Sequence, residues 1–139
     1  NKRKTLINMK QFVVLFIASL FTITAFAQKP PVKFTAETHS FGKIKLNKPV
    51  TKEFVFQNTS NQPVVIEFAT AECGCTTPDY PKQPIAKGQT AKIKVTFNAA
   101  SIGTFKKSVT VKFVKYNAPV ILTIDGEVTT PPAAKGKVK

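Results

Sequence analysis

The sequence predicts an all-β domain, an immunoglobulin-like antiparallel β-sandwich of about seven strands. After residue 28, apolar and polar residues alternate over short segments, as in strands with one buried and one exposed face. Clusters of turn-forming residues separate these segments, and no sustained helical period appears among them. About seven short strands in about 100 residues are typical of such a sandwich.

The expected strands follow one another at short intervals. The first is the segment 32–34, and the second is 39–44, where Gly42 indicates a bulge or a close approach. The third runs over 50–57 and the fourth over 64–68, with a turn-rich connection between them. Three longer segments follow, whose apolar rows are Ala91, Ile93, Val95 and Phe97; Phe105, Val109, Val111 and Phe113; and Val120, Leu122, Ile124 and Val128.

These rows predict a core between two sheets, because residues of one parity share one face of a strand. We expect the following side chains to be buried: Phe54, Phe56, Ile66, Phe68, Ile93, Val95, Phe97, Val109, Val111, Leu122 and Ile124. The 139 residues are enough for one domain of this kind with terminal extensions.

The first 27 residues have the pattern of an export signal with a few residues upstream. Met9 and Lys10 precede an apolar segment, 12–24, and Ala25-Phe26-Ala27 resembles a signal peptidase site. The apolar segment is shorter than the roughly 20 residues that span a bilayer as a helix; an uncleaved membrane anchor is the alternative. We therefore expect cleavage before Gln28 and a periplasmic or extracellular location, in a Gram-negative bacterium. The mature chain would comprise the sandwich domain, 28–129, and a disordered basic tail, 130–139.

The chain is strongly basic, with a net charge of +14. Removing residues 1–27 takes away three lysines and the one arginine, which leaves +10. We expect a solubilising surface that also hinders pairing at sheet edges; the alternative is a basic binding face for an anionic envelope component. Its candidate residues are Lys52, Lys92, Lys94, Lys106 and Lys112. Because the mature chain lacks arginine and is exported, we do not expect nucleic acid as a partner.

Cys73-Gly74-Cys75 contains the only two cysteines of the chain. On an extended strand their Cα atoms would lie about 6.5 Å apart, near the upper limit of disulfide geometry, and Gly74 can bend the chain. Three interpretations stay open: a disulfide without chemistry of its own, a redox-active pair, and two thiolates that bind a soft ion such as Cu(I). Zinc would need about four ligands, more than this pair and His39 supply.

Several short motifs resemble those of the family called domain of unknown function 1573. The resemblance extends from about Phe34 to Val128. Its members are typically exported bacterial proteins, and their domain is similar to PapD-like and Hydin-like sandwiches, which implies a fold and a compartment but no catalytic residue. The motifs are Phe41-Gly42-Lys43-Ile44; Phe54-Val55-Phe56-Gln57-Asn58-Thr59; Glu72-Cys73-Gly74-Cys75-Thr76-Thr77-Pro78; Pro84-Ile85-Ala86-Lys87-Gly88; and Gly103-Thr104-Phe105.

We expect a non-enzymatic binding or structural module of the periplasm or cell envelope. A hydrolase is poorly supported, because His39 is the only histidine and no nucleophile accompanies it in sequence. We expect no cofactor, no resident metal and no transmembrane span in the mature chain. The partner would be a protein or an anionic envelope component. The alternative function is a thiol-disulfide or copper-handling protein that uses Cys73 and Cys75.

Overall fold

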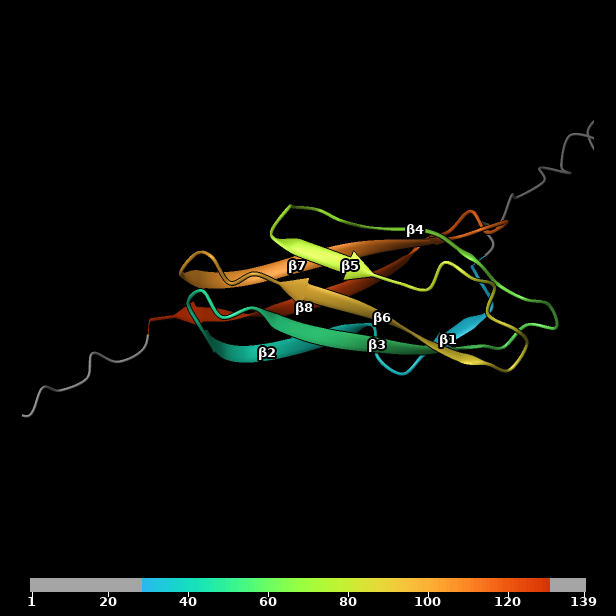
Figure 1. The fold of residues 1–139 in the computed structure, drawn as a ribbon, viewed down its shortest axis with the longest axis horizontal. Helices are drawn as coiled ribbons and strands as arrows, with labels where there is room; N and C mark the ends of the chain where they lie inside the picture. Colours follow the sequence, from blue (N-terminus) through green and yellow to red (C-terminus); the bar gives the residue numbers. More distant parts are fainter. Residues whose placement is uncertain (1–28, 131–139) are drawn as a thin grey trace, which may run out of the picture.

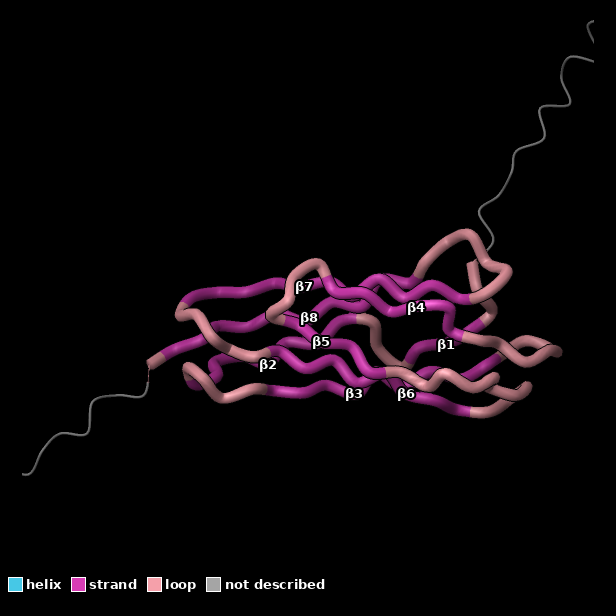
Figure 2. The backbone as a smooth tube through the Cα atoms, turned by 45° about the horizontal axis from the view of Figure 1, so that its top comes forward, coloured by secondary structure: helices cyan, strands magenta, loops and turns pink. Residues whose placement is uncertain are grey.

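The computed structural model describes residues 29–130, which form eight strands in two sheets of four (Figures 1 and 2). This confirms the predicted all-β sandwich. The export signal and the basic tail predicted above lie outside the described residues, apart from Thr130. No helix in the described part of the chain could cross a membrane. The strands are β1 Val32–Phe34, β2 Thr38–Lys45, β3 Val50–Asn58, β4 Ile66–Ala71, β5 Thr76–Asp79, β6 Thr90–Phe97, β7 Gly103–Phe113 and β8 Val120–Thr129.

The strand order is that of an immunoglobulin-like sandwich. One sheet has the order β1-β3-β6-β5, which corresponds to the A-B-E-D sheet of that fold. The other has the order β2-β8-β7-β4, in which β4, β7 and β8 correspond to C-F-G and β2 is an additional strand beside β8. The first two strands belong to different sheets, so the chain changes sheet between Phe34 and Thr38. As a result β2 runs parallel to β8, whereas the sequence predicted antiparallel strands throughout.

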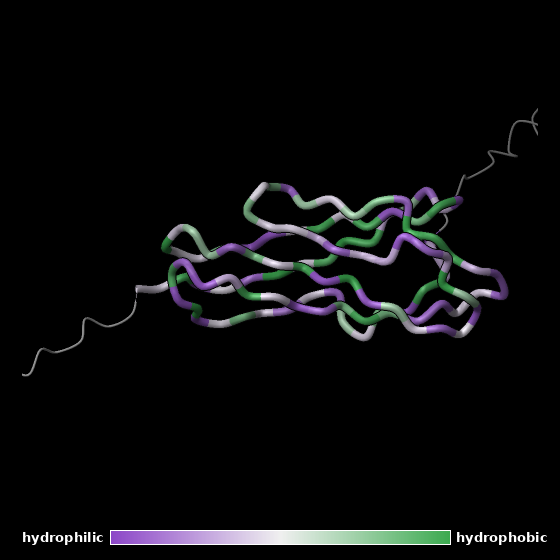
Figure 3. The backbone as a smooth tube through the Cα atoms, viewed as in Figure 1, coloured by the Kyte–Doolittle hydropathy of each residue, from purple (hydrophilic) through white to green (hydrophobic). Residues whose placement is uncertain are grey.

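The core lies between the two sheets and holds ten of the eleven side chains predicted for it. Figure 3 shows the alternation of hydropathy along the strands that produces it. Two aromatic pairs join the sheets. Phe56 of β3 meets Phe113 of β7 edge to face, with ring centroids 5.7 Å apart, and Phe97 of β6 stacks on Phe105 of β7 at 4.0 Å.

Phe68 is the exception, and the prediction that it is buried is wrong. Its side chain is 40% exposed. The pairing of β4 with β7 shifts between Ile66 and Phe68, so Glu67 is an extra residue that reverses the alternation. Beyond this bulge, Ala69 and Ala71 take the core-facing positions, and both pack against the core.

The eighth strand, β5, was not predicted from the sequence. It is four residues long and contains Pro78, a residue that lacks the N–H group a central strand needs. The structure resolves this conflict by putting β5 at the edge of its sheet, where it pairs with β6 alone. It begins directly after the two cysteines, so its position fixes one side of the cysteine loop.

Gly42 marks a bulge in β2, as the sequence predicts. Its φ is +64°, and the pairing of β2 with β8 shifts between Ser40 and Lys43. The bulge brings the Gly42 carbonyl close to Gly126 of β8. A Cβ on Gly126 would lie 2.7 Å from that oxygen and 2.9 Å from the ring of Phe105. Glycine is therefore needed at position 126 for packing.

Candidate functional site

The two cysteines lie in the loop between β4 and β5 and are joined by a disulfide, with their Cα atoms 5.3 Å apart. Hydrogen bonds of the backbone attach this loop to its neighbours. The Glu72 N–H donates to the Ser108 carbonyl of β7 at 3.2 Å, and the Asn98 N–H donates to the Cys75 carbonyl at 3.0 Å. Both cysteines are partly exposed, and Gly74 between them is exposed. The loop is thus anchored at its base and open at its tip.

A buried hydroxyl lies beneath the disulfide. The Thr76 Oγ1 atom is 3.9 Å from Cys73 Sγ and 3.8 Å from Cys75 Sγ, while the Thr76 side chain is almost fully buried. Sulfur atoms of a disulfide carry no proton, so the hydroxyl is the only donor available to either of these contacts. Thr76 therefore holds a weak hydrogen-bond donor toward both sulfurs.

A hollow of about 220 Å³ opens beside Cys75. The loop between β6 and β7 forms its other wall, where the side chain of Ile102 is 63% exposed. Lys107 of β7 lines the hollow as well, together with the stacked rings of Phe97 and Phe105. The disulfide thus borders a small surface that combines apolar side chains with one cation.

The sole histidine is far from the cysteines. His39 lies on β2, and β8 and β7 separate β2 from β4 in the same sheet, which corresponds to roughly 14 Å. Burial lowers the pKa of His39, nearby Lys52 lowers it further, and Asp125 opposes both effects. Residues 29–130 contain no group of three or more histidine, cysteine, aspartate and glutamate residues that could hold a metal ion. His39 and the cysteines therefore do not form a joint site.

The predicted basic face is divided between the two sheets. The prediction treated the strands that carry Lys94 and Lys106 as neighbours, but β6 and β7 belong to different sheets. Lys52 has the parity of the core residues Phe54 and Phe56 and is half-buried. The five candidates, Lys52, Lys92, Lys94, Lys106 and Lys112, therefore do not share one surface.

Two of these lysines are also paired within the chain. Lys92 Nζ lies 2.9 Å from Glu53 Oε1 on the neighbouring strand, and the hydrogen bond from Lys92 lowers the pKa of Glu53. Lys112 Nζ lies 3.7 Å from Glu67 Oε2 and also donates to the Tyr116 carbonyl. Their charge is partly neutralised, so they match the expected solubilising surface better than an anion-binding face.

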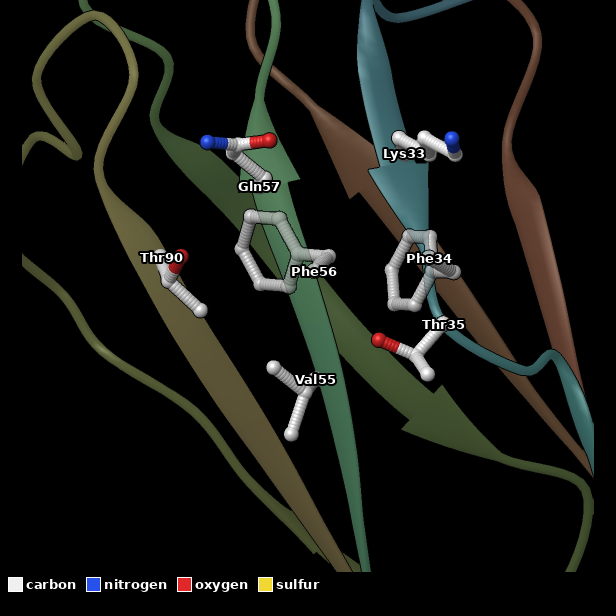
Figure 4. Close-up of a pocket in the computed structure, with 7 residues that line it drawn as sticks. All are labelled: Lys33, Phe34, Thr35, Val55, Phe56, Gln57 and Thr90. Atoms are coloured by element: carbon white, nitrogen blue, oxygen red, sulfur yellow. The ribbon is translucent and has the colours of Figure 1, made fainter.

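A second hollow, of about 540 Å³, lies over β1, β3 and β6 (Figure 4). The rings of Phe34 and Phe56 stand beside each other there, with centroids 5.0 Å apart. Lys33 is its only charged lining residue, and the lining contains no histidine, cysteine or carboxylate. This hollow therefore offers no acid, base or nucleophile.

Asn58 connects two of the sequence motifs, 54–59 and 84–88, and gives both a structural role. Its fully buried side chain donates to the carbonyls of Gln62 and Ile85, at 2.8 and 2.9 Å, and accepts from Ser60. Its backbone carbonyl accepts from the Gly88 N–H at 2.9 Å. Asn58 thus ties the β3–β4 connection to the β5–β6 connection. In the Cys-Gly-Cys motif, Cys75 packs against the edge of the core, whereas Gly74 is exposed.

β4 is a free sheet edge next to the cysteine loop. The sequence did not predict this edge, because Phe68 was expected in the core. β4 pairs only with β7 and lies along one border of the sandwich (Figure 1). The sequence contains a pattern that could have indicated which residues of β4 face the core. Ala69 and Ala71 alternate with Thr70 and Glu72, which is a regular apolar-polar pattern of the parity opposite to that of Ile66.

Strand order and sheet pairing define the class as an immunoglobulin-like sandwich. Among solved structures, the chain resembles the ASH/PapD-like domain 7 of human CEP192, with a TM-score of 0.62, 8% identity, and coverage of 73% of this chain and 87% of that one. Residues 32–128 match the family described as protein of unknown function DUF1573, and the chain belongs to this family. No curated protein sequence matches it.

Two further structures have the same fold. The chain resembles a protein of unknown function from Porphyromonas gingivalis W83, with a TM-score of 0.61, 11% identity, and coverage of 78% of this chain and 51% of that one. It also resembles the secreted serine protease VesC from Vibrio cholerae, with a TM-score of 0.57, 10% identity, and coverage of 73% and 24%. The chain thus spans only part of these two proteins, and at such identities the similarity concerns the fold alone.

Proposed function

We propose that this protein is an exported, non-enzymatic binding module of the periplasm or cell envelope. Its partner is a protein, and it binds an extended segment of that partner along the free edge of β4. Export is supported by the signal-like residues 1–27. The observation that carries the binding proposal is the open edge of β4 beside the exposed ring of Phe68.

The other three edge strands carry features that hinder the addition of a further strand. β1 has three residues, and β5 has four and contains Pro78. β2 is bulged at Gly42 and carries Lys43 and Lys45. Short strands, proline, bulges and lysines are the usual means of keeping sheet edges apart. β4 is also bulged, at Glu67, but from Phe68 to Ala71 it is regular, and it has neither proline nor lysine, so this part of β4 is the edge best suited to strand addition.

The backbone groups available on β4 can be named. The Glu72 N–H donates to β7, and in an antiparallel pair the bonded residues alternate with residues whose groups point away. The N–H and C=O groups of Ala69 and Ala71 therefore face the free edge. A partner strand would bond to these two residues, and its side chains would lie against Phe68 on the outer face of the sheet.

A site-specific photocrosslinker tests the proposal. It is introduced at Phe68 and, in a matched protein, at Val55, whose side chain is 36% exposed on a central strand of the other sheet. We expect an adduct with one envelope protein from position 68 and none from position 55. With that partner purified, F68A should weaken the affinity about tenfold, equivalent to about 1.4 kcal/mol, and V55A should leave it unchanged within about twofold. Equal labelling from both positions, or equal affinity losses, would refute binding at β4.

A further inference from the structure

We propose that the Cys73–Cys75 disulfide is an exchange site that accepts two electrons from a dithiol of a partner protein. This capacity goes beyond the proposed binding function and depends on other residues. β4 binds through Ala69, Ala71 and Phe68, whereas the exchange site is formed by the cysteine loop, Thr76 and Lys107. Either proposal can therefore fail while the other stands.

The disulfide contributes little to the stability of the fold. It encloses one residue, so the loop that it closes in the unfolded chain is very short, and the stabilisation from chain entropy is small. The loop is also held without it, by the backbone hydrogen bonds from Glu72 to Ser108 and from Asn98 to Cys75. A disulfide at this position is thus better explained by its chemistry than by the stability it adds.

Gly74, between the two cysteines, lies in an open part of the surface. Its φ is outside the left-handed region, and a Cβ built on it would meet no atom within 4 Å. Neither the backbone conformation nor packing therefore requires glycine here. The surroundings of Gly74 are therefore open, and Cys73 and Cys75 on either side of it are both partly exposed.

Two neighbouring groups can stabilise a thiolate that leaves the bridge. The Thr76 hydroxyl lies within 3.9 Å of both sulfurs and can donate to either one. Lys107 lines the hollow beside Cys75 and supplies a positive charge. A hydrogen-bond donor and a nearby cation both favour the thiolate form of a cysteine, and a better-stabilised leaving thiolate departs faster.

The exchange runs in two displacements. A partner thiolate enters the hollow and attacks Cys75 Sγ, which breaks the Cys73–Cys75 bond, forms a mixed disulfide with Cys75 and releases Cys73 as a thiolate. The second partner thiolate attacks the partner sulfur of this mixed disulfide and releases Cys75. The partner ends with a disulfide, Cys73 and Cys75 end as thiols, and the two protons lost by the partner thiols are taken up by the cysteines.

The residues that line the hollow also indicate what kind of partner segment would bind there. Exposed Ile102 and the edges of Phe97 and Phe105 offer an apolar surface beside the sulfur. A partner cysteine with a large apolar neighbour in the sequence would fill this surface as its sulfur reaches Cys75. The substrate class is therefore a protein dithiol in an extended, apolar segment.

The test measures how fast the bridge of the purified oxidised protein is reduced, by acid quench, alkylation and mass spectrometry. The probes are a synthetic peptide with two cysteines flanked by leucines, and dithiothreitol as a small dithiol. We expect K107Q and T76V to slow reduction by both probes severalfold, and K106Q, the neighbouring lysine outside the hollow, to leave both rates unchanged. I102A should slow the peptide but not dithiothreitol. Equal rates for K107Q and K106Q would overturn the proposed role of the hollow.

Single-cysteine variants test the order of attack. The probe here is a peptide whose single cysteine is joined to a small thiol by a disulfide. In Cys73→Ser the lone Cys75 thiolate attacks the peptide sulfur, releases the small thiol and forms a mixed disulfide that no second peptide thiol can resolve. We expect Cys73→Ser to accumulate this mixed disulfide faster than Cys75→Ser does. The double variant tests the premise that the bridge is not structural, and its melting temperature should fall by only a few degrees. Unfolding of the double variant, or faster accumulation on Cys73, would contradict the proposal.

Discussion

At the scale of single residues, Asn58 contributes most to the organisation of the loops. Its side chain is fully buried, yet every one of its polar atoms has a partner, and its bonds connect two loops that are far apart in the sequence. Burial of an amide is favourable only with its hydrogen bonds made, so removing the amide group costs both the bonds and the packing.

N58A should therefore lower the free energy of unfolding by about 2 kcal/mol. The loss arises because the carbonyls of Gln62 and Ile85 each lose a donor and a cavity remains. A urea titration of the purified protein measures this loss. Asn61, three residues further along the same connection and exposed, supplies the control, since N61A should stay within about 0.5 kcal/mol. Equal losses would show that Asn58 does not tie the loops together.

At the scale of strands, β6 shows how alternation produces the sandwich. Ile93, Val95 and Phe97 are buried, whereas Lys92 and Lys94, which have the opposite parity, are exposed. Phe97 reaches across the core to stack on Phe105 of the other sheet. The row therefore joins the two sheets as well as filling the space between them.

F97A should cost roughly 3–5 kcal/mol of unfolding free energy, because it removes a buried ring and leaves a cavity between the sheets. K94A, on the opposite face of the same strand, should change this free energy by no more than about 0.5 kcal/mol. Denaturant titration of both variants provides the measurement. Similar losses would contradict the inward direction of Phe97 and the outward direction of Lys94.

The strands that the sequence predicts well are those with an uninterrupted ladder. In the pairs β3–β6 and β7–β8 one residue faces one residue, and the register shifts of the sheets fall on β2 and β4, so parity alone identifies the buried rows of β6, β7 and β8. The predictions from the sequence were wrong where the fold departs from the local alternation of apolar and polar residues. Phe68 follows a bulge, β5 contains Pro78, and the assignment of Lys94 and Lys106 to one face depended on which sheet each strand joins. Sheet assignment is set by contacts between distant segments, which a local pattern does not contain.

The candidate site was predictable only in part. Its two cysteines were evident from their spacing, because Cys73-Gly74-Cys75 contains the only sulfhydryl residues of the chain. Thr76, Ile102 and Lys107 were not, because the hollow joins the β4–β5 and β6–β7 connections across the sandwich. The free edge of β4 was not predictable either, because it depends on the order of the four strands in its sheet.

At the scale of the whole molecule, residues 1–27, which have the sequence pattern of an export signal, precede the sandwich domain. The envelope protein should begin at Gln28, because Ala25-Phe26-Ala27 provides small residues where signal peptidase cleaves. Mass spectrometry of the protein isolated from the envelope should find this terminus, with or without cyclisation to pyroglutamate. Peptides from residues 12–26 in the envelope protein would mean that the segment is retained as an anchor.

The central claim is that a partner strand adds to β4, and amide hydrogen exchange measured by NMR tests it most directly. The sample is the complex with the protein that crosslinks at position 68. Exchange at Ala69 and Ala71 should slow by roughly tenfold or more. Thr70 and Glu72, which already bond to β7, should change little and serve as the internal control. Protection gained at β1, β2 or β5 instead, or no gain at Ala69 and Ala71, would contradict binding by strand addition at β4.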